Sequence, residues 1–297
     1  MKQTTQREKI LVYGSYKVGK STLWLDIMQA SYAAGLKIHF YLIDTDRAYS
    51  KMIEEMDVDY EAEGYLTVYL PDDFPELMEA SMEIRELAGK GDWVVIDMLN
   101  YPWTETQDYY TEKVFGETPD NYFLAMREQV VAKKGNDARS FGGFEGTDWN
   151  FITKTYKQWE TPLTMKGDWN VFAVTEARKM DSRDDDPEKA KTYKEVSGHI
   201  PVGQKGIGHR FDTVFHMRQR VNGDRELHMV GDRGREKEGG AWAELGTNVI
   251  TIGEYPKGFT RRYLVDIAGW ERGKKKKAKS APKPRSKPGT SAPARRR

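Results

Sequence analysis

Gly14-Ser15-Tyr16-Lys17-Val18-Gly19-Lys20-Ser21-Thr22 is the most informative stretch of this sequence of 297 residues. It fits the pattern G-x-x-x-x-G-K-[ST] between a β-forming run and a run with helical spacing, the context such a loop requires. Its glycines let backbone N–H groups curl around a phosphate chain, and the following helix N-terminus adds partial positive charge. The stretch therefore predicts an ATP-binding loop, in which Lys20 reaches the β- and γ-phosphates and Ser21 ligates Mg²⁺. The alternative is a chance glycine turn with a surface lysine, which the flanking strand and helix disfavour.

The second half of this site is expected at Asp97, which follows the apolar run Trp93–Ile96. A carboxylate at the end of a strand can hold Mg²⁺ through the water shell that this ion usually keeps. The alternative is an ordinary aspartate in a turn. The phosphate-binding pattern elsewhere in the chain favours the metal role.

Two further carboxylates, Asp44 and Asp46, follow the apolar run Lys37–Ile43. The carboxyl end of a parallel strand is the edge where open α/β sheets bind ligands. One of the two could polarise the water that attacks the γ-phosphate, and strand alternation predicts that both point the same way. The alternative is that one of them caps a helix that begins before Arg47. For Asp44 this role fits as well as the catalytic one, and for Asp46 it fits less well.

The first hundred residues alternate between strand and helix signals, which predicts βαβ units and a mainly parallel sheet flanked by helices. Short β-rich or apolar runs mark the expected strands at 9–13, 37–43, 66–70 and 93–96. Helices are expected from Ser21 to Gly35 and over 75–88.

The later part of the chain is less regular. Helical spacing predicts helices over 120–134 and from Asp148 onward, with Asp148 as a cap. Further strands are expected at 169–174, 249–252 and 263–267. Residues 211–220 and 226–230 predict a late antiparallel hairpin across Asn222-Gly223.

Composition excludes several classes of protein. There are no cysteines, which excludes disulfides and thiolate metal sites. No apolar run approaches the roughly 20 residues that span a bilayer, so no membrane association is expected. The polar start Met1–Lys9 lacks the apolar segment of a secretory signal. A cytoplasmic location is expected, in the host cell if the protein is viral.

The near-neutral net charge hides a strong asymmetry. Residues 273–297 hold 11 of the 47 basic residues and no acidic one, which leaves 36 basic against 46 acidic residues in the rest of the chain. This segment also lacks the apolar residues that offset the entropy of ordering. We therefore expect one domain over 1–272 and a disordered basic tail over 273–297.

The pattern resembles the RecA-like ATPase core, and most closely the phage ATPases of that type linked to single-strand annealing and recombination. The resemblance covers residues 9–235 and is carried by the loop, by Leu42–Ala48 and by Val94–Asp97. It implies that Asp46 takes the place of the catalytic glutamate of RecA-like recombinases, although aspartate is one methylene shorter. It also implies that Asp97 lies on the magnesium-associated strand.

The same resemblance assigns roles to residues later in the chain. Val171–Glu176 is similar to the strand whose last polar residue senses the γ-phosphate, which would be Glu176 here, where recombinases commonly have glutamine. The alternative is a strand-end glutamate in solvent. Arg233, in Gly231–Arg235, could reach the γ-phosphate of a neighbouring subunit, and the alternative is an ordinary surface arginine.

DNA-facing loops are implied at two places. One is Ala177–His209, with Arg178 and Lys179, although its mixed charge also fits a solvated lid or a subunit contact. The other is Lys134–Phe144, where Arg139 and Phe141 could clamp and stack bases. The alternative there is a glycine-rich loop without a binding role.

The resemblance thus implies a Mg²⁺-dependent ATPase that acts on DNA, with single-stranded DNA as the expected form, in phage-type recombination, annealing or repair. A homo-oligomer is expected, and a single-strand-binding or another replication protein is a further expected partner. The basic tail would add affinity for DNA or contact an acidic partner. The alternatives are a helicase or packaging motor, a P-loop kinase of a nucleotide or small metabolite, and an ATP-sensing module without hydrolysis.

Overall fold

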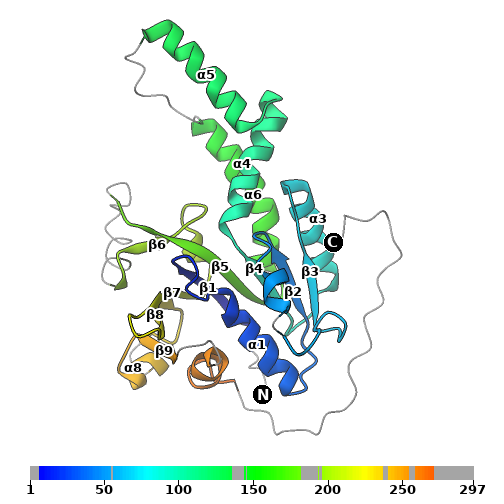
Figure 1. Ribbon diagram of the computed structural model, residues 1–297, viewed down its shortest axis with the longest axis vertical. Coiled ribbons are helices and arrows are strands. Elements are labelled where there is room, and N and C mark those ends of the chain that lie inside the picture. The colour runs from blue at the N-terminus through cyan, green and yellow to red at the C-terminus, as the bar shows by residue number, and fades with distance from the viewer. Residues whose placement is uncertain are drawn as a thin grey trace.

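The computed structural model describes residues 7–54, 56–135, 144, 146–181, 193, 196–236, 240–253 and 258–270. Nine strands of this part of the chain form one sheet (Figure 1). In spatial order the strands are β3 (Leu66–Tyr69), β2 (Phe40–Asp44), β4 (Trp93–Asp97), β5 (Asn170–Lys179), β1 (Lys9–Gly14), β7 (Thr213–Gln219), β8 (Arg225–Asp232) and β9 (Val249–Gly253), with β6 (His199–Pro201) paired to β5.

The six strands from β3 to β7 run parallel, whereas β8, β9 and β6 pair antiparallel with their neighbours. Every residue of β1, β2 and β4 is buried, which explains why these strands read as continuous apolar runs and do not alternate. The expected α/β fold with a mainly parallel sheet is therefore confirmed, and so is the late hairpin, which turns at Asn222-Gly223.

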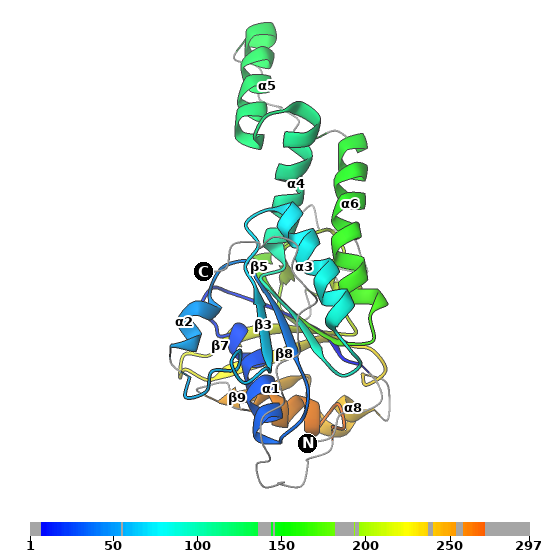
Figure 2. The ribbon, with the colours of Figure 1, turned by 90° about the vertical axis from the view of Figure 1, so that its right-hand side faces the viewer.

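Helices cover both faces of the sheet (Figures 1 and 2). Helix α1 (Ser21–Ala33) and the helical turns Thr260–Val265 pack on one face, and α3 (Phe74–Leu87) and α6 (Gly146–Thr161) pack on the other. Shorter helical segments are α2 (Tyr49–Ile53), Pro162–Lys166, Ile207–Arg210 and α8 (Ala241–Leu245).

Helices α4 (Asn100–Phe115), α5 (Pro119–Lys134) and α6 form an arm that rises from the sheet, with α5 at its far end (Figure 2). Helix α4 packs against both α5 and α6. Aromatic rings make these contacts: Phe115 stacks on Tyr122 at 3.9 Å, and Trp103 stacks on Trp149 at 6.2 Å between ring centroids. No α5 side chain that the structure describes is buried.

Some expected elements were wrong. No strand forms at 263–267: the helical turns Thr260–Val265 continue into a turn there, and they bury Tyr263, Leu264 and Ile267 in the same apolar cluster. Asp148 does not cap α6, which begins at Gly146; it accepts a hydrogen bond from the Tyr110 hydroxyl at 2.8 Å. Helix α4 was not expected from the sequence.

Two sets of predictions lie outside the described residues: the basic tail 273–297, and Arg139 and Phe141. Within the described ranges, no helix combines the length and apolar character needed to cross a membrane.

Candidate nucleotide and metal site

Four parallel strands end at one edge of the sheet and bring the predicted site residues together. The register pairs Gly14 of β1 with Glu176 of β5, and Asp97 of β4 with Val174 of β5 and Asp44 of β2. Strand β5 thus separates the strand before the loop from the strand that carries Asp97. This edge is where open α/β sheets bind ligands.

The loop from Ser15 to Lys20 joins β1 to α1, and other parts of the chain approach closely at Gly14 and Gly19. A Cβ atom at Gly14 would lie 2.6 Å from the carbonyl oxygen of Met217, so only glycine fits beside β7. At Gly19, φ is +94°, which favours glycine, and an added Cβ would lie 2.9 Å from Arg225 Nε. Both glycines of the motif are therefore required by the backbone itself.

Lys20 is the central cation of the loop. Its side chain is buried, and Nζ donates hydrogen bonds to the carbonyl oxygens of Gly14 at 3.1 Å and Ser15 at 2.9 Å. Burial lowers the pKa of Lys20, and the negative charges of Asp97, Glu176 and Asp46 oppose this shift. The sequence-predicted carboxylates are thus close enough to act electrostatically on the predicted lysine.

Asp97 lies almost completely buried, 2% exposed, beside the start of α1. The Trp24 indole Nε1 donates a hydrogen bond to Asp97 Oδ2 at 3.1 Å, whereas Oδ1 is buried and has no hydrogen-bond partner among the described residues. Burial raises the pKa of Asp97 to about 6, the Ser21 hydroxyl lowers it, Asp46 raises it, and Trp24 and Lys20 lower it.

These groups fit a magnesium ion. Mg²⁺ prefers oxygen ligands and usually keeps several waters, so it needs only one or two protein groups beside phosphate oxygens. The Ser21 hydroxyl and the unpartnered Oδ1 of Asp97 are oxygens of this kind, from α1 and β4. Among the residues that the structure describes, no three His, Asp or Glu side chains form a cage for a metal.

Asp44 and Asp46 differ in their surroundings. Asp44 is buried and accepts hydrogen bonds from the N–H groups of Ala48 and Tyr49 at 3.2 and 3.0 Å, so it holds the start of α2. Burial, together with the interaction with Asp46, raises the pKa of Asp44 to about 7. Asp46 is exposed and accepts from the Ala48 N–H at 3.1 Å, which leaves it better placed to meet a water molecule.

Other predicted residues are placed differently with respect to the loop. Glu176 is exposed at the same edge, and Arg178 and Lys179 follow it, exposed, on the part of β5 that pairs with β6. Arg233 is not brought to this site: it follows β8 at the opposite edge, where it forms an ion pair with Asp212 at 3.1 Å. A role for Arg233 at the site of a neighbouring subunit stays a prediction.

Sequence reasoning missed two residues that touch this site. Arg225, at the start of β8, donates from Nε to the carbonyl oxygen of Val18 in the loop at 2.8 Å. No local signal connects positions so far apart in the chain. Trp24 could have been predicted from the sequence, because it stands three residues after Ser21 and therefore lies on the same face of α1.

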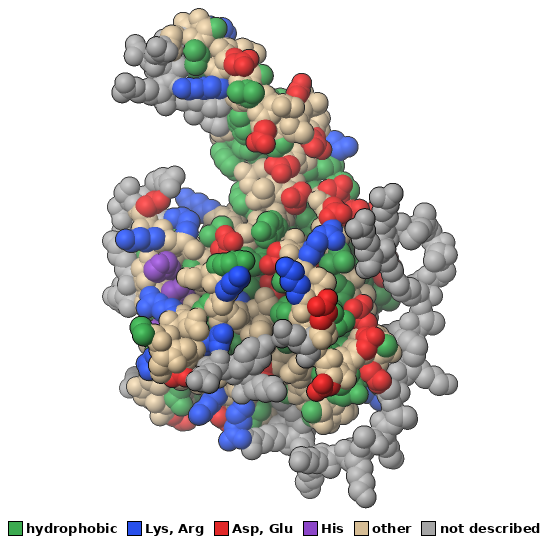
Figure 3. Space-filling view, viewed as in Figure 1, with side chains coloured by type: hydrophobic (Ala, Val, Ile, Leu, Met, Phe, Trp, Pro, Cys, Tyr) green, Lys and Arg blue, Asp and Glu red, His purple; other side chains and the backbone are tan. Residues whose placement is uncertain are grey.

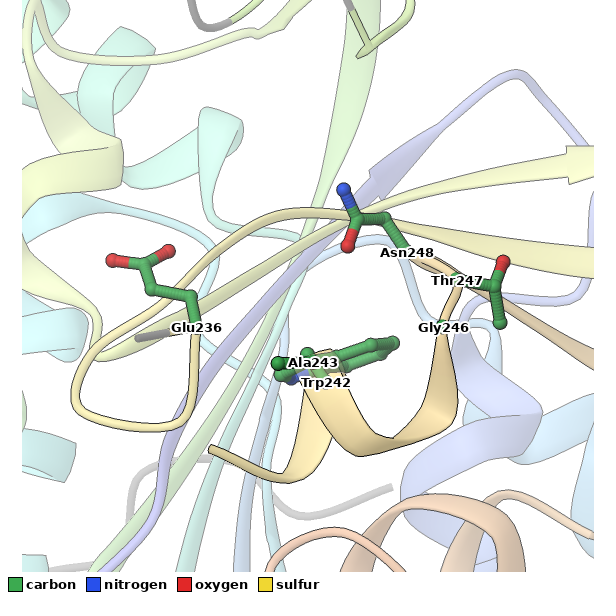
Figure 4. Close-up of a pocket in the computed structure, with 6 residues that line it drawn as sticks. All are labelled: Glu236, Trp242, Ala243, Gly246, Thr247 and Asn248. Carbon is green, nitrogen blue, oxygen red and sulfur yellow. The ribbon is translucent and has the colours of Figure 1, made fainter. Parts of the chain in front are cut away.

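A separate pocket of 430 Å³ lies beside α8 and is unsuited to a phosphate chain (Figure 4). Among the described residues of its lining, the only charged side chain is Glu236, whose Oε2 accepts a hydrogen bond from the Asp232 N–H at 3.1 Å. Because Asp232 ends β8 at the edge opposite the loop, the pocket is remote from Lys20. Its lining consists of Glu236, Trp242, Ala243, Gly246, Thr247 and Asn248.

Three aromatic rings, from β1, β7 and β6, stack on one another. The His216 ring stacks between Tyr13 at 4.7 Å and His199 at 5.3 Å, and its Nδ1 accepts a hydrogen bond from Arg218 Nε at 3.1 Å. Burial, together with the charges of Arg218, His199 and His228, lowers the pKa of His216 to about 3. The folded protein therefore holds His216 neutral.

This arrangement predicts acid sensitivity. Below pH 6.5 the unfolded chain protonates His216 and the folded chain does not, so stability falls as the pH falls from 6.5 towards 3. The loss is about 1.4 kcal/mol per pH unit, or about 2 kcal/mol at pH 5. His216→Phe keeps the stacked ring and removes the titration. In urea unfolding at pH 5 and 7, the stability lost on acidification should be about 2 kcal/mol smaller in His216→Phe than in wild type.

The exposed His209 supplies the control for this experiment. His209→Phe should keep the wild-type loss between pH 7 and pH 5. An unchanged acid loss in His216→Phe would contradict the assignment of a neutral, buried His216.

Comparison of the sequence with family models and with curated proteins finds no match.

Proposed function

We propose that this chain is a Mg²⁺-dependent ATPase with a RecA-like core that acts on DNA, with single-stranded DNA as the expected form, as a homo-oligomer in phage-type recombination, annealing or repair. The observation that carries the proposal is the buried Lys20 ammonium within a strand–loop–helix. The negative charges of Asp97, Glu176 and Asp46 lie close enough to raise its pKa. Such an arrangement suits a triphosphate with a divalent ion.

The residues divide the chemistry between binding and positioning. The loop amides and Lys20 would hold the phosphates, and Ser21 and Asp97 would hold the ion. Mg²⁺, when bound, neutralises charge that develops on the transferred phosphoryl group. Asp46, exposed at the same edge, would accept a hydrogen bond from water and orient it, with Glu176 as the second candidate.

Positive side chains at the same edge support the DNA part of the proposal. Arg178 and Lys179 are exposed at the end of β5, and Arg220 is exposed just after β7. Arg218 of β7 donates to the Ser197 carbonyl oxygen at 2.8 Å, which ties this strand to the segment before β6. Figure 3 shows Lys, Arg and His side chains gathered on the side where β6, β7 and β8 lie. Phosphate backbones require such a positive surface.

ATP turnover measured with and without single-stranded DNA tests the proposal. We expect Mg²⁺-dependent turnover that DNA increases, with the increase weakening as salt rises because phosphate contacts release counterions. Phosphoryl transfer to a small acceptor would instead identify a P-loop kinase. ATP binding without turnover would identify an ATP-sensing module, and either result would overturn the proposed function.

The exposed position of Asp46 predicts a selective effect of Asp46→Asn. The amide keeps the size of the side chain but loses the charge that polarises water, so turnover should fall about 100-fold. ATP affinity should change less than about threefold, because Asp46 does not hold the phosphates. Steady-state turnover and calorimetric titration of ATP measure the two effects.

Asp57→Asn, which removes an exposed carboxylate after α2, is the matched control and should leave both quantities unchanged. Equal losses of turnover and affinity in Asp46→Asn would show that Asp46 is structural.

A further inference from the structure

The Trp24 indole is hydrogen-bonded to the carboxylate of Asp97 in the interior of the protein. Nε1 donates to Oδ2 at 3.1 Å, and the two residues are 0% and 2% exposed. A buried indole N–H normally finds an acceptor, and a buried carboxylate needs donors. This contact therefore gives the indole N–H an acceptor and gives Oδ2 of the carboxylate a donor.

The position of Trp24 follows from helical geometry. Ser21 and Trp24 are three residues apart on α1, so their side chains lie on the same face of the helix. The Ser21 hydroxyl and the Trp24 indole both act on the Asp97 carboxylate. The helix that begins at the phosphate-binding loop thus fixes the loop, the hydroxyl and the carboxylate relative to one another.

The other contacts of these residues restrict their movement. The Trp24 ring packs on the Tyr49 ring at 5.9 Å, and the N–H of Tyr49 donates to Asp44. The carbonyl oxygen of Asp97 accepts a hydrogen bond from the Thr45 N–H at 2.7 Å. The backbone carbonyl and Oδ2 of Asp97 are thus both hydrogen-bonded, whereas its other carboxylate oxygen, Oδ1, has no hydrogen-bond partner in the part of the chain that the structure describes.

We propose that Trp24 is a positioning residue for Mg²⁺: its indole N–H holds Oδ2 of Asp97 and so leaves Oδ1 available to the ion. This inference rests on the proposed function of the site. Groups that hydrogen-bond to a metal ligand and fix its orientation typically change metal affinity 10- to 100-fold when they are removed. Trp24 would do this for a carboxylate that acts beside the Ser21 hydroxyl.

The test compares ATP affinity with Mg²⁺ and with EDTA, by calorimetry on the full chain. The ratio of the two dissociation constants reports the contribution of the ion, and each protein serves as its own reference. In Trp24→Phe the Mg²⁺-dependent gain should fall about 10-fold, while the affinity in EDTA stays close to wild type.

Trp93→Phe is the matched control. Trp93 is equally buried, at the start of the strand β4 that carries Asp97, but its indole N–H has no hydrogen-bond partner among the described residues. This variant loses the same indole volume without losing a contact to Asp97, so it should keep the wild-type Mg²⁺-dependent gain. Thermal unfolding of both variants measures the cost of the lost volume separately.

The outcomes separate this inference from the proposed function. If wild type binds no ATP, the proposed function fails and the inference falls with it. If wild type shows the Mg²⁺-dependent gain and Trp24→Phe keeps it, or loses affinity equally in Mg²⁺ and EDTA, the inference alone is overturned.

Should Trp24→Phe fail to fold, the wild-type protein supplies the test. Its Trp24 indole N–H resonance, recognised by its contact with the Tyr49 ring, should shift when Mg²⁺ is added to the ATP-bound protein. An unshifted resonance would overturn the inference.

Discussion

Lys20→Ala should abolish productive ATP binding while the protein keeps its fold. The Lys20 ammonium donates to the carbonyl oxygens of Gly14, at the end of β1, and of Ser15 in the loop. Two charge-assisted hydrogen bonds to phosphate would be lost, so affinity should fall at least about 100-fold. Burial lowers the pKa of Lys20, which means that keeping this charge away from water destabilises the folded state. Removing the charge should therefore leave the melting temperature equal to or above that of wild type.

Calorimetric titration with ATP and Mg²⁺, beside a thermal melt, measures both parts of this expectation. Lys17→Ala is the control from the same loop, because Lys17 is exposed and its ammonium lies over the Tyr16 ring at 5.1 Å. Lys17→Ala should bind ATP nearly as wild type does. A comparable loss of affinity in both variants would show that general positive charge, and not the position of Lys20, holds the phosphates.

The sequence located this site because the required signals are local. The glycine spacing, the lysine and the hydroxyl residue all lie within Gly14–Thr22, and the strand and helix around them are short-range features. Asp97 could be added because parallel strands end at one edge of a sheet, so an acidic residue at the end of another buried strand falls near the loop. Neither step needs the topology of the rest of the chain.

Residues that depend on topology could not be placed in this way. Arg225 reaches Val18 because β8 runs antiparallel to β7, which brings the start of β8 to the edge that carries the loop. The same direction takes Arg233, at the other end of β8, to the opposite edge. A sequence motif shows an arginine after a strand, but the direction and neighbours of that strand decide what the arginine meets.

Alternation along a strand also has a limit, which Asp44 and Asp46 show. Their carboxyl groups interact, as expected for residues on one side of a strand. Strand β2 ends at Asp44, however, and the chain then turns into α2, so Asp44 is buried as a cap and Asp46 is exposed. Similarly, the short apolar run at 263–267 fits a strand and a helix equally well, and only packing against α1 and the sheet decides between them.

The network around Arg235 predicts the largest effect on stability. The Arg235 guanidinium donates to both carboxylate oxygens of Glu8, at 2.6 and 3.1 Å, and to Asp232 Oδ1 at 3.1 Å. Glu8 and Asp232 are 1% and 0% exposed, and burial raises the pKa of each carboxyl group, which Arg235 opposes. Arg235→Met would leave two buried carboxylates without their cation, at a cost of about 3–5 kcal/mol in the free energy of unfolding.

The pH dependence of this loss has a defined sign. Without Arg235, the pKa values of Glu8 and Asp232 in the folded state rise further above those in the unfolded chain, so the folded state binds more protons above about pH 4. The stability of Arg235→Met relative to wild type should therefore be lower at pH 7 than at pH 5. Urea unfolding at the two pH values measures this difference.

Arg233→Met is the matched control, two residues away. The Arg233 side chain is 72% exposed, and its ion pair with Asp212 is of the kind that contributes at most about 1 kcal/mol. Similar losses in the two variants would contradict the buried network as a determinant of stability.

The network also joins the residue before β1 to the end of β8 and, through Tyr263, to the helical turns Thr260–Val265. Because β8 delivers Arg225 to the loop, a loosened end of β8 should weaken ATP binding as well, although Arg235 lies at the opposite edge of the sheet.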